Sequence, residues 1–94
     1  MTALPLIAVR VRVTGLVHGV FFRASMAQVA AEHEVRGWVR NRLDGSVEAV
    51  LEGEEENVRK VVDWAKRGPP RARVDGVNVV RTKPKNLRGF RIEG

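Results

Sequence analysis

The chain has 94 residues, enough for one hydrophobic core and too few for two. A hydrophobic fraction of 44% is typical of a folded globular domain and excludes a disordered chain. The sequence contains no cysteine, which excludes both a disulfide scaffold and a thiol nucleophile.

Charge and hydropathy limit the partners and the cellular location that the sequence allows. The net charge of +6 indicates either a solvated, arginine-rich surface or attraction to an anionic partner. No apolar run approaches the ~20 residues needed to cross a bilayer, and residues 1–6 lack the charged and apolar regions of a signal peptide. We therefore expect a single cytoplasmic domain over residues 1–94, monomeric and without a membrane partner.

The first two predicted elements are a strand over residues 6–14 and a helix over residues 22–34. In the strand, apolar and polar side chains alternate, which is typical of one buried and one exposed face. The apolar face consists of Ile7, Val9, Val11 and Val13. In the helix, the inward positions recur at helical spacing and comprise Phe22, Met26, Val29, Ala30 and His33.

A hairpin and a second helix follow. Residues 35–42 and 47–52 are predicted as antiparallel strands, because Asp44-Gly45 between them is typical of a tight hairpin turn. Residues 54–67 are predicted as an amphipathic helix with an acidic start and a basic end, the charge order that the helix dipole favours.

The last third of the chain is predicted to add two strands. Gly68-Pro69-Pro70 ends the second helix. A strand is expected over residues 73–82, a loop over 83–87 and a short strand over 88–93, with Phe90 and Ile92 on one side. The order β-α-β-β-α-β plus a short strand predicts an α+β fold: a ferredoxin-like two-layer sandwich, with an antiparallel sheet and both helices on one face.

The loop between the first strand and the first helix is the strongest candidate for a binding site. Gly15 and Gly19 bracket a turn that can direct successive backbone N–H groups toward one anion. The start of the helix adds unpaired N–H groups and the positive end of its dipole. Arg23 is expected in the first helical turn, where its guanidinium can reach the same anion. These residues predict a phosphate site that needs no metal.

Four blocks of the sequence, in order and across nearly the whole chain, resemble the acylphosphatase family. They are Gly15-x-Val17-x-Gly19-Val20-x-Phe22-Arg23; Gly37-Trp38-Val39-x-Asn41 with Asp44-Gly45-Ser46-Val47-Glu48; Gly68-Pro69-Pro70-x-Ala72-Arg73-Val74; and Gly89-Phe90-x-Ile92. The chain departs from the family pattern at His18, where glutamine is usual, and at Arg42-Leu43, where Leu-Pro is commoner.

The resemblance implies hydrolysis of the carboxyl–phosphate bond of acyl phosphates, giving a carboxylate and inorganic phosphate. It implies that Arg23 binds the phosphate and that Asn41 orients the attacking water. The loop residues expected to hold the phosphate with Arg23 are Gly15, Leu16, Val17, His18, Gly19 and Val20. No cofactor or metal is expected, and inorganic phosphate is expected to compete with the substrate.

The residues present suit this chemistry. The leaving carboxylate has a conjugate acid with a pKa of about 4, so no general acid is needed. Asn41 cannot act as a base near neutral pH, but its amide can hold a water by hydrogen bonds. The proton of that water is then expected to pass to a phosphate oxygen of the substrate.

Two alternatives remain open from the sequence. One is an RNA-binding module, because RNA-recognition domains share this element order; however, the strand over residues 47–52 has none of the aromatic side chains on which such domains stack bases. Nucleic acid is therefore an unfavoured partner. The other is a catalytically quiet domain that binds phosphate or regulates a larger enzyme.

Overall fold

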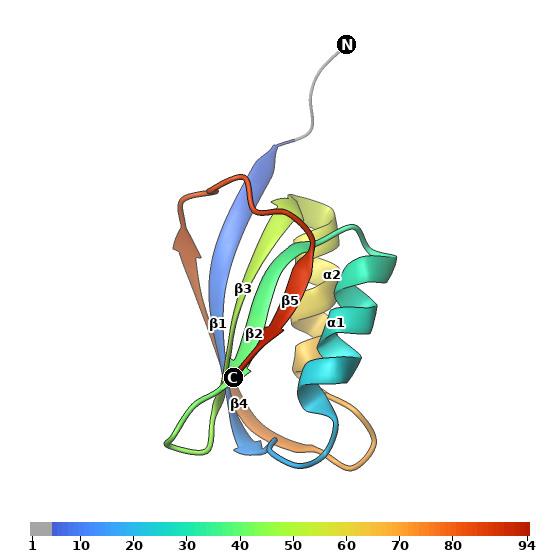
Figure 1. Ribbon diagram of the computed structural model, residues 1–94, viewed down its shortest axis with the longest axis vertical. Coiled ribbons are helices and arrows are strands. Elements are labelled where there is room, and N and C mark those ends of the chain that lie inside the picture. The colour runs from blue at the N-terminus through green and yellow to red at the C-terminus, as the bar shows by residue number, and fades with distance from the viewer. Residues whose placement is uncertain (1–4) are drawn as a thin grey trace.

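Two helices lie on one face of a five-stranded sheet in the computed structural model, which describes residues 5–94 (Figure 1). Residues 1–4 lie outside the described residues, so the structure does not describe most of residues 1–6, for which we expect no signal peptide. The elements are β1 (Leu6–Leu16), α1 (Phe22–Glu32), β2 (Arg36–Asn41), β3 (Val47–Glu54), α2 (Glu55–Ala65), β4 (Arg73–Thr82) and β5 (Phe90–Glu93). Every boundary falls within two residues of its predicted position.

The strand order is β4-β1-β3-β2-β5, which confirms the ferredoxin-like prediction. Four strands pair antiparallel, as expected. The added strand β5 pairs parallel with β2, with Gly37 opposite Phe90, so the complete sheet is mixed. Because β4 and β5 occupy opposite edges, the chain between them has to cross the whole sheet.

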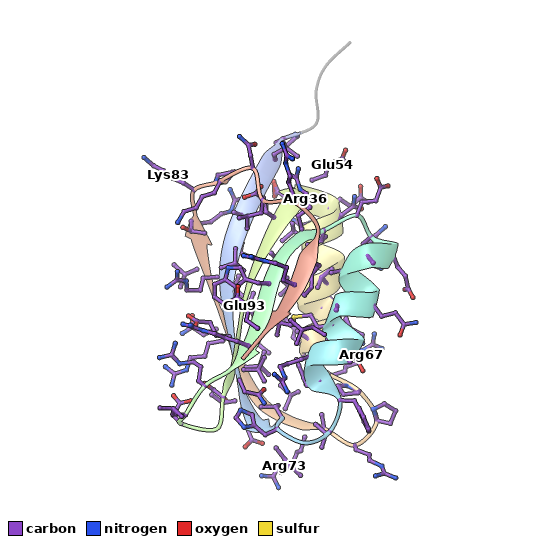
Figure 2. The ribbon with its side chains drawn as sticks, viewed as in Figure 1. Arg36, Glu54, Arg67, Arg73, Lys83 and Glu93 are labelled. Carbon is purple, nitrogen blue, oxygen red and sulfur yellow. The ribbon has the colours of Figure 1, made fainter. Side chains whose placement is uncertain are left out.

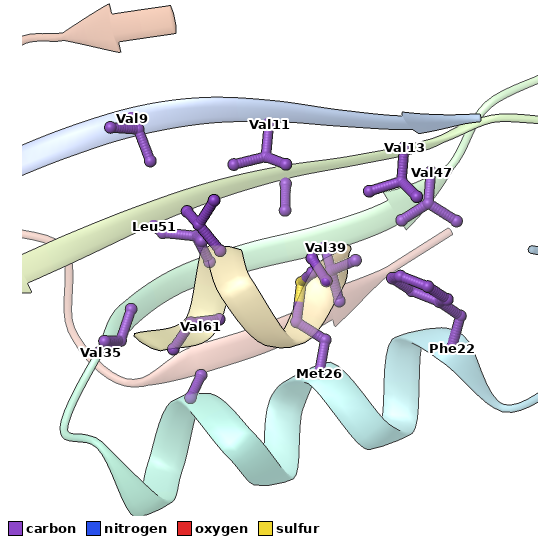
Figure 3. Close-up of a cluster of buried hydrophobic side chains, with 14 of the residues drawn as sticks. Val9, Val11, Val13, Phe22, Met26, Val35, Val39, Val47, Leu51 and Val61 are labelled. Atoms are coloured by element: carbon purple, nitrogen blue, oxygen red, sulfur yellow. The ribbon is translucent and has the colours of Figure 1, made fainter. Parts of the chain in front are cut away.

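The core lies between the sheet and the two helices (Figure 3). Val9, Val11 and Val13 are buried, which confirms the predicted inward face of β1. Helix α1 contributes Phe22, Met26 and Ala30, and α2 contributes Val58, Val61, Val62 and Ala65. Complete burial of one Val, Leu, Phe or Met side chain contributes roughly 1.5–3 kcal/mol, so this contact fixes the helices on the sheet.

The open face of the sheet is crossed by residues 83–89, which we call the crossover strap (Figure 1). The buried carboxylate of Glu52, on that face of β3, accepts the backbone N–H groups of Lys85 at 2.6 Å and Leu87 at 2.9 Å. The guanidinium of Arg36 lies 3.5 Å from the same carboxylate. Glu52 therefore anchors the segment that brings β5 to its place beside β2.

Charged side chains are spread over the outside of the molecule, from Lys83 beside the sheet to Arg67 on the helix side (Figure 2). Helix α2 ends at Ala65, so Lys66 and Arg67 lie just beyond the last turn in which they were predicted. Residues 5–94 include no helix long and apolar enough to span a membrane. Within the same residues, no cluster of three or more His, Cys, Asp or Glu side chains could hold a metal ion.

Candidate active site at the start of helix α1

Strand β1 continues two residues further than predicted, because a bulge at Thr14/Gly15 keeps it paired with β4. Gly15 has a φ of +125°, and a Cβ atom there would lie 2.1 Å from the carbonyl oxygen of Arg73. Only glycine fits this close approach of two backbones. The loop between β1 and α1 is therefore residues 17–21, and Gly15 sets the angle at which the chain enters it.

The N-terminus of α1 is open to a ligand. Phe21 at the N-cap has left-handed backbone angles (φ 62°, ψ 27°) and supplies no capping hydrogen bond, and no acidic residue occupies the first turn. Among residues 5–94, the N–H groups of His18 to Phe21 donate to no backbone carbonyl. Unpaired N–H groups at a helix start, together with the positive end of the dipole, form an anion-binding arrangement.

A cavity of about 330 Å³ opens at this helix start. It is lined by Val17, Gly19, Phe21, Phe22, Arg23, Ala24, Asn41 and Ile92. The cavity thus brings together four of the predicted site residues, Val17, Gly19, Arg23 and Asn41. Four others, Gly15, Leu16, His18 and Val20, are not among the residues that line it.

Arg23 and Asn41 are the two lining residues with polar side chains. Arg23 is half-buried in the first turn of α1, as predicted, and its Nη1 donates to the backbone carbonyl of Glu93 at 3.2 Å. Asn41 is the last residue of β2. Its Oδ1 atom is buried and accepts no hydrogen bond from residues 5–94. The cavity is therefore lined by Arg23, whose guanidinium is hydrogen-bonded to Glu93, and by Asn41, whose Oδ1 accepts no hydrogen bond from residues 5–94.

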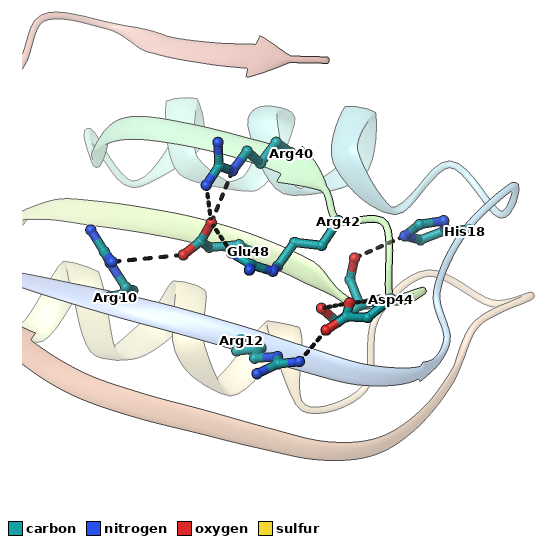
Figure 4. A network of polar contacts seen from close by, with 8 residues as sticks. Arg10, Arg12, His18, Arg40, Arg42, Asp44 and Glu48 are labelled. Atoms are coloured by element: carbon teal, nitrogen blue, oxygen red, sulfur yellow. Dashed lines mark hydrogen bonds and ion pairs between the residues drawn. The ribbon is translucent and has the colours of Figure 1, made fainter.

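His18 connects the loop before α1 to the β2–β3 hairpin (Figure 4). The ring Nε2 is 2.8 Å from the carbonyl oxygen of Ser46. A carbonyl only accepts, so Nε2 carries the proton in this contact. His18 thus fixes the loop to the same turn that follows Asn41.

The hairpin itself is held by its own hydrogen bonds. Arg42 N–H donates to the Ser46 carbonyl at 2.8 Å, and Gly45 N–H donates to the Arg42 carbonyl at 3.1 Å, which confirms the predicted turn. The Asp44 carboxylate accepts the hydroxyl and the backbone N–H of Ser46 at 2.6 and 2.9 Å, and Arg12 pairs with it. These two Ser46 hydrogen bonds, aided by Arg12 and Arg42, lower the pKa of Asp44 from 3.8 to about 2.

The buried carboxylate of Glu48 organises the arginines on the open face of the sheet (Figure 4). Glu48 pairs with Arg40 at 2.7 Å, Arg42 at 2.9 Å and Arg10 at 3.8 Å. Burial would raise the pKa of Glu48, but hydrogen bonds from Arg40 and Arg42 outweigh burial and lower it. Side chains alternate along a strand, so Arg40 and Arg42 point away from the face on which Asn41 meets the cavity.

Sequence reasoning missed the contribution of β5 to the site. Ile92 lines the cavity, and the carbonyl of Glu93 holds Arg23. The sequence signal for this contribution is the block Gly89-Phe90-x-Ile92, which resembles the family pattern but indicates no role by itself.

A larger cavity of about 530 Å³ lies around the other end of α1, near Ala31. Neither Arg23 nor Asn41 lines it.

Fold and site together define a small ferredoxin-like α+β protein whose first helix is preceded by N–H groups that donate to no backbone carbonyl among residues 5–94. The family model described as Acylphosphatase matches residues 9–92, and the chain belongs to the acylphosphatase family. An acylphosphatase of Pyrobaculum islandicum is 60% identical over 68 residues, covering 71% of this chain and 72% of the relative.

Solved structures agree with this assignment. An acylphosphatase from Coxiella burnetii superimposes with a TM-score of 0.90 at 36% identity, covering 94% of this chain and 93% of the other. HypF of T. kodakarensis superimposes with a TM-score of 0.83 at 32% identity, covering 94% of this chain but 12% of the much longer HypF chain. The same domain is therefore found both in short chains and as a small part of a larger protein.

Proposed function

We propose that the chain carries out the reaction of its family, hydrolysis of acyl phosphates to a carboxylate and inorganic phosphate, in the cavity at the start of α1. The observation that carries this proposal is that one cavity is lined both by Arg23 and by Asn41, whose buried Oδ1 has no hydrogen-bond partner among residues 5–94. The uncapped start of α1 supports it, because it supplies N–H donors to the same space.

In this proposal the phosphoryl group is bound by the N–H groups of the loop and by Arg23. The negative charge that spreads over the phosphoryl oxygens in a loose transition state is met by these donors. The Arg23–Glu93 contact leaves the rest of the guanidinium fork free for the phosphate while limiting its motion. Arg23 thereby contributes both charge and position.

Asn41 is proposed to place the attacking water. Its Oδ1 accepts a hydrogen bond from that water, which directs the water oxygen toward phosphorus. The new P–O bond forms as the bond from phosphorus to the acyl oxygen breaks, and the carboxylate leaves with the electron pair. One water proton passes to a phosphate oxygen, so the products are the carboxylate and dihydrogen phosphate. Inorganic phosphate is expected to compete with the substrate for the same donors.

The test is hydrolysis of benzoyl phosphate by Arg23→Ala and Asn41→Ala beside the wild type. Removal of one preorganised charged donor costs roughly 100- to 1,000-fold in rate, so Arg23→Ala is expected to lose that much kcat/KM and to weaken inhibition by phosphate. Asn41→Ala is expected to lose kcat while phosphate still inhibits. Arg67→Ala is the control, because Arg67 is exposed and lies outside the cavity.

The contrary outcomes are distinct. Near-normal turnover by Asn41→Ala together with loss in Arg23→Ala would refute the water-positioning role. A folded wild-type protein that binds phosphate without turning over any acyl phosphate would favour the quiet domain instead.

A further inference from the structure

The active-site cavity is lined by both polar and apolar side chains. Arg23 and Asn41 are its polar residues. Phe21 at the N-cap of α1 and Ile92 in β5 line the same cavity from elements far apart in the sequence. Both are large apolar side chains left in water: Phe21 is 75% and Ile92 is 49% exposed.

Neither side chain is held in the core by its own packing. Phe21 has a left-handed backbone conformation, which is unfavourable for a bulky residue, and its side chain is exposed. Ile92 alternates with residues of β5 that face the sheet's open side, yet it is not among the residues that pack in the core cluster, unlike Phe90 in the same strand. Single exposed apolar residues need no explanation, but two that line one cavity together with Arg23 and Asn41 indicate a ligand-binding surface.

We propose that Phe21 and Ile92 form an apolar subsite that holds the acyl group of the substrate, so that the chain prefers uncharged aromatic or branched acyl phosphates. This inference rests on the proposed function, because it places the phosphoryl group on Arg23. In-line displacement places the leaving carboxylate opposite the water held by Asn41, so the acyl group is directed away from Asn41. Among the other lining side chains, Phe21 and Ile92 are the large exposed ones. Among residues 5–94, Arg23 is the one cationic side chain that lines the cavity.

A negatively charged acyl group would lack a partner here. Arg40 and Arg42, which flank Asn41 in the sequence, are already paired with Glu48. They line a neighbouring cavity of about 360 Å³ that shares only Asn41 with the active-site cavity. An anionic acyl group would therefore have to bind in that neighbouring cavity. Succinyl phosphate would then be the preferred substrate, which is the opposite of our prediction.

The experiment measures kcat and KM for acetyl, benzoyl and succinyl phosphate with the wild type, Phe21→Asn and Ile92→Thr. Asparagine tolerates the left-handed backbone of position 21, and threonine keeps the β-branched shape needed at position 92. Leu43→Asn is the matched control, because Leu43 is a fully exposed apolar residue outside the active-site cavity.

Each substrate has its own intrinsic reactivity, so the ratio of benzoyl to acetyl kcat/KM is compared between wild type and variant. Loss of apolar contact with a substrate group changes discrimination by roughly 10-fold or more. Both variants are expected to lower the benzoyl-to-acetyl ratio by about 10-fold, mainly through the KM for benzoyl phosphate, and Leu43→Asn is expected to leave it unchanged.

Three results would overturn the subsite. Variants that lower kcat/KM for benzoyl and acetyl phosphate equally would show a general structural effect. An unchanged ratio in both variants, or succinyl phosphate as the best substrate of the wild type, would place the acyl group elsewhere. All three leave the proposed hydrolysis intact, whereas failure of the folded wild type to hydrolyse any of the three compounds overturns the hydrolysis and the subsite together.

Discussion

The Nε2 atom of His18 lies 2.8 Å from the carbonyl oxygen of Ser46, across 28 positions of sequence. This contact joins the loop that carries the N–H donors to the hairpin that follows Asn41. The loop before α1 and Asn41 at the end of β2 belong to different elements, so the distance between them depends on contacts such as this one. His18 is in this sense a positioning residue, and its ring is not among the residues that line the cavity.

Replacement of His18 by alanine is expected to raise KM and the inhibition constant for phosphate by about 5- to 10-fold, because a typical hydrogen bond contributes about 1 kcal/mol. kcat is expected to change less, since Arg23 and Asn41 remain. His18→Gln keeps an N–H donor of similar reach and should restore most of the lost affinity. Equal defects in both variants would show that the ring acts through its bulk and not through the hydrogen bond.

Asn41 is expected to serve activity at the expense of stability. A buried polar atom without a partner costs about 1–3 kcal/mol unless water satisfies it, and Oδ1 of Asn41 has no partner among residues 5–94. Asn41→Ala should therefore be no less stable than the wild type in urea unfolding, although it loses kcat. A fall of more than about 1 kcal/mol in the free energy of unfolding would mean that the amide is structural.

The low pKa of Asp44 predicts a stability change in acid. The hydrogen bonds from Ser46 hold the pKa at about 2 in the folded protein, against an ordinary value of 3.8. The unfolded chain therefore takes up the proton first as the pH falls. The stabilising effect of the carboxylate is complete above about pH 4 and is lost as the pH falls toward 2.

Urea unfolding of the wild type and Asp44→Asn should accordingly differ at pH 6 and converge near pH 2. Asp63→Asn is the control, since the exposed Asp63–Lys66 pair at 3.5 Å contributes little. A difference between wild type and Asp44→Asn that stays constant from pH 6 to 2 would contradict the assignment.

Glu52→Gln is expected to loosen the crossover strap. The carboxylate accepts two backbone N–H groups from the strap, and hydrogen bonds to a charged acceptor contribute about 1.5–3 kcal/mol each. The amide can still accept one of the two. The free energy of unfolding should fall by about 2 kcal/mol, and the amides of Lys85 and Leu87 should exchange faster in deuterated water. Glu56→Gln, at an exposed position of α2, should change neither measurement.

Gly68→Ala is expected to disturb the active-site cavity by displacing Phe22. A Cβ atom at position 68 would lie 2.7 Å from the ring of Phe22, a lining residue, and φ there is +69°. Gly89 has a similar φ of +64° with open space around it, so Gly89→Ala costs only backbone strain, about 1 kcal/mol. Gly68→Ala should be less stable than Gly89→Ala and should also lose activity. Equal effects would mean that Phe22 yields without cost.

The order and type of the elements were predictable because periodicity reports burial on one face. Val9, Val11 and Val13 alternate and are buried, and the Asp44-Gly45 pair marks the turn it was expected to mark. Boundaries were less accurate where tertiary contacts extend an element. β1 runs on to Leu16 because its backbone pairs with β4 across a bulge, a contact that no local pattern of residues 6–14 contains.

The site was predictable only in part for the same reason. The loop and Arg23 are local in sequence, and the resemblance supplied Asn41. The contributions of Ile92 and Glu93 depend on β5 lying parallel beside β2, and a four-residue strand gives no sequence signal for its partner or direction. The role of His18 likewise depends on the position of the Ser46 carbonyl.

Because the crossover strap carries β5 to its place, activity is expected to depend on when β5 docks during folding. Arg23 finds its carbonyl partner 70 positions further along, in a segment that must first traverse the open face and dock at the far edge of the sheet. Contacts of such long range form late, because the entropy of loop closure precedes any gain. During refolding, helical circular dichroism should therefore recover before turnover does. Recovery of turnover would then report when β5 docks beside β2, because Arg23 gains its Glu93 carbonyl partner only with that docking.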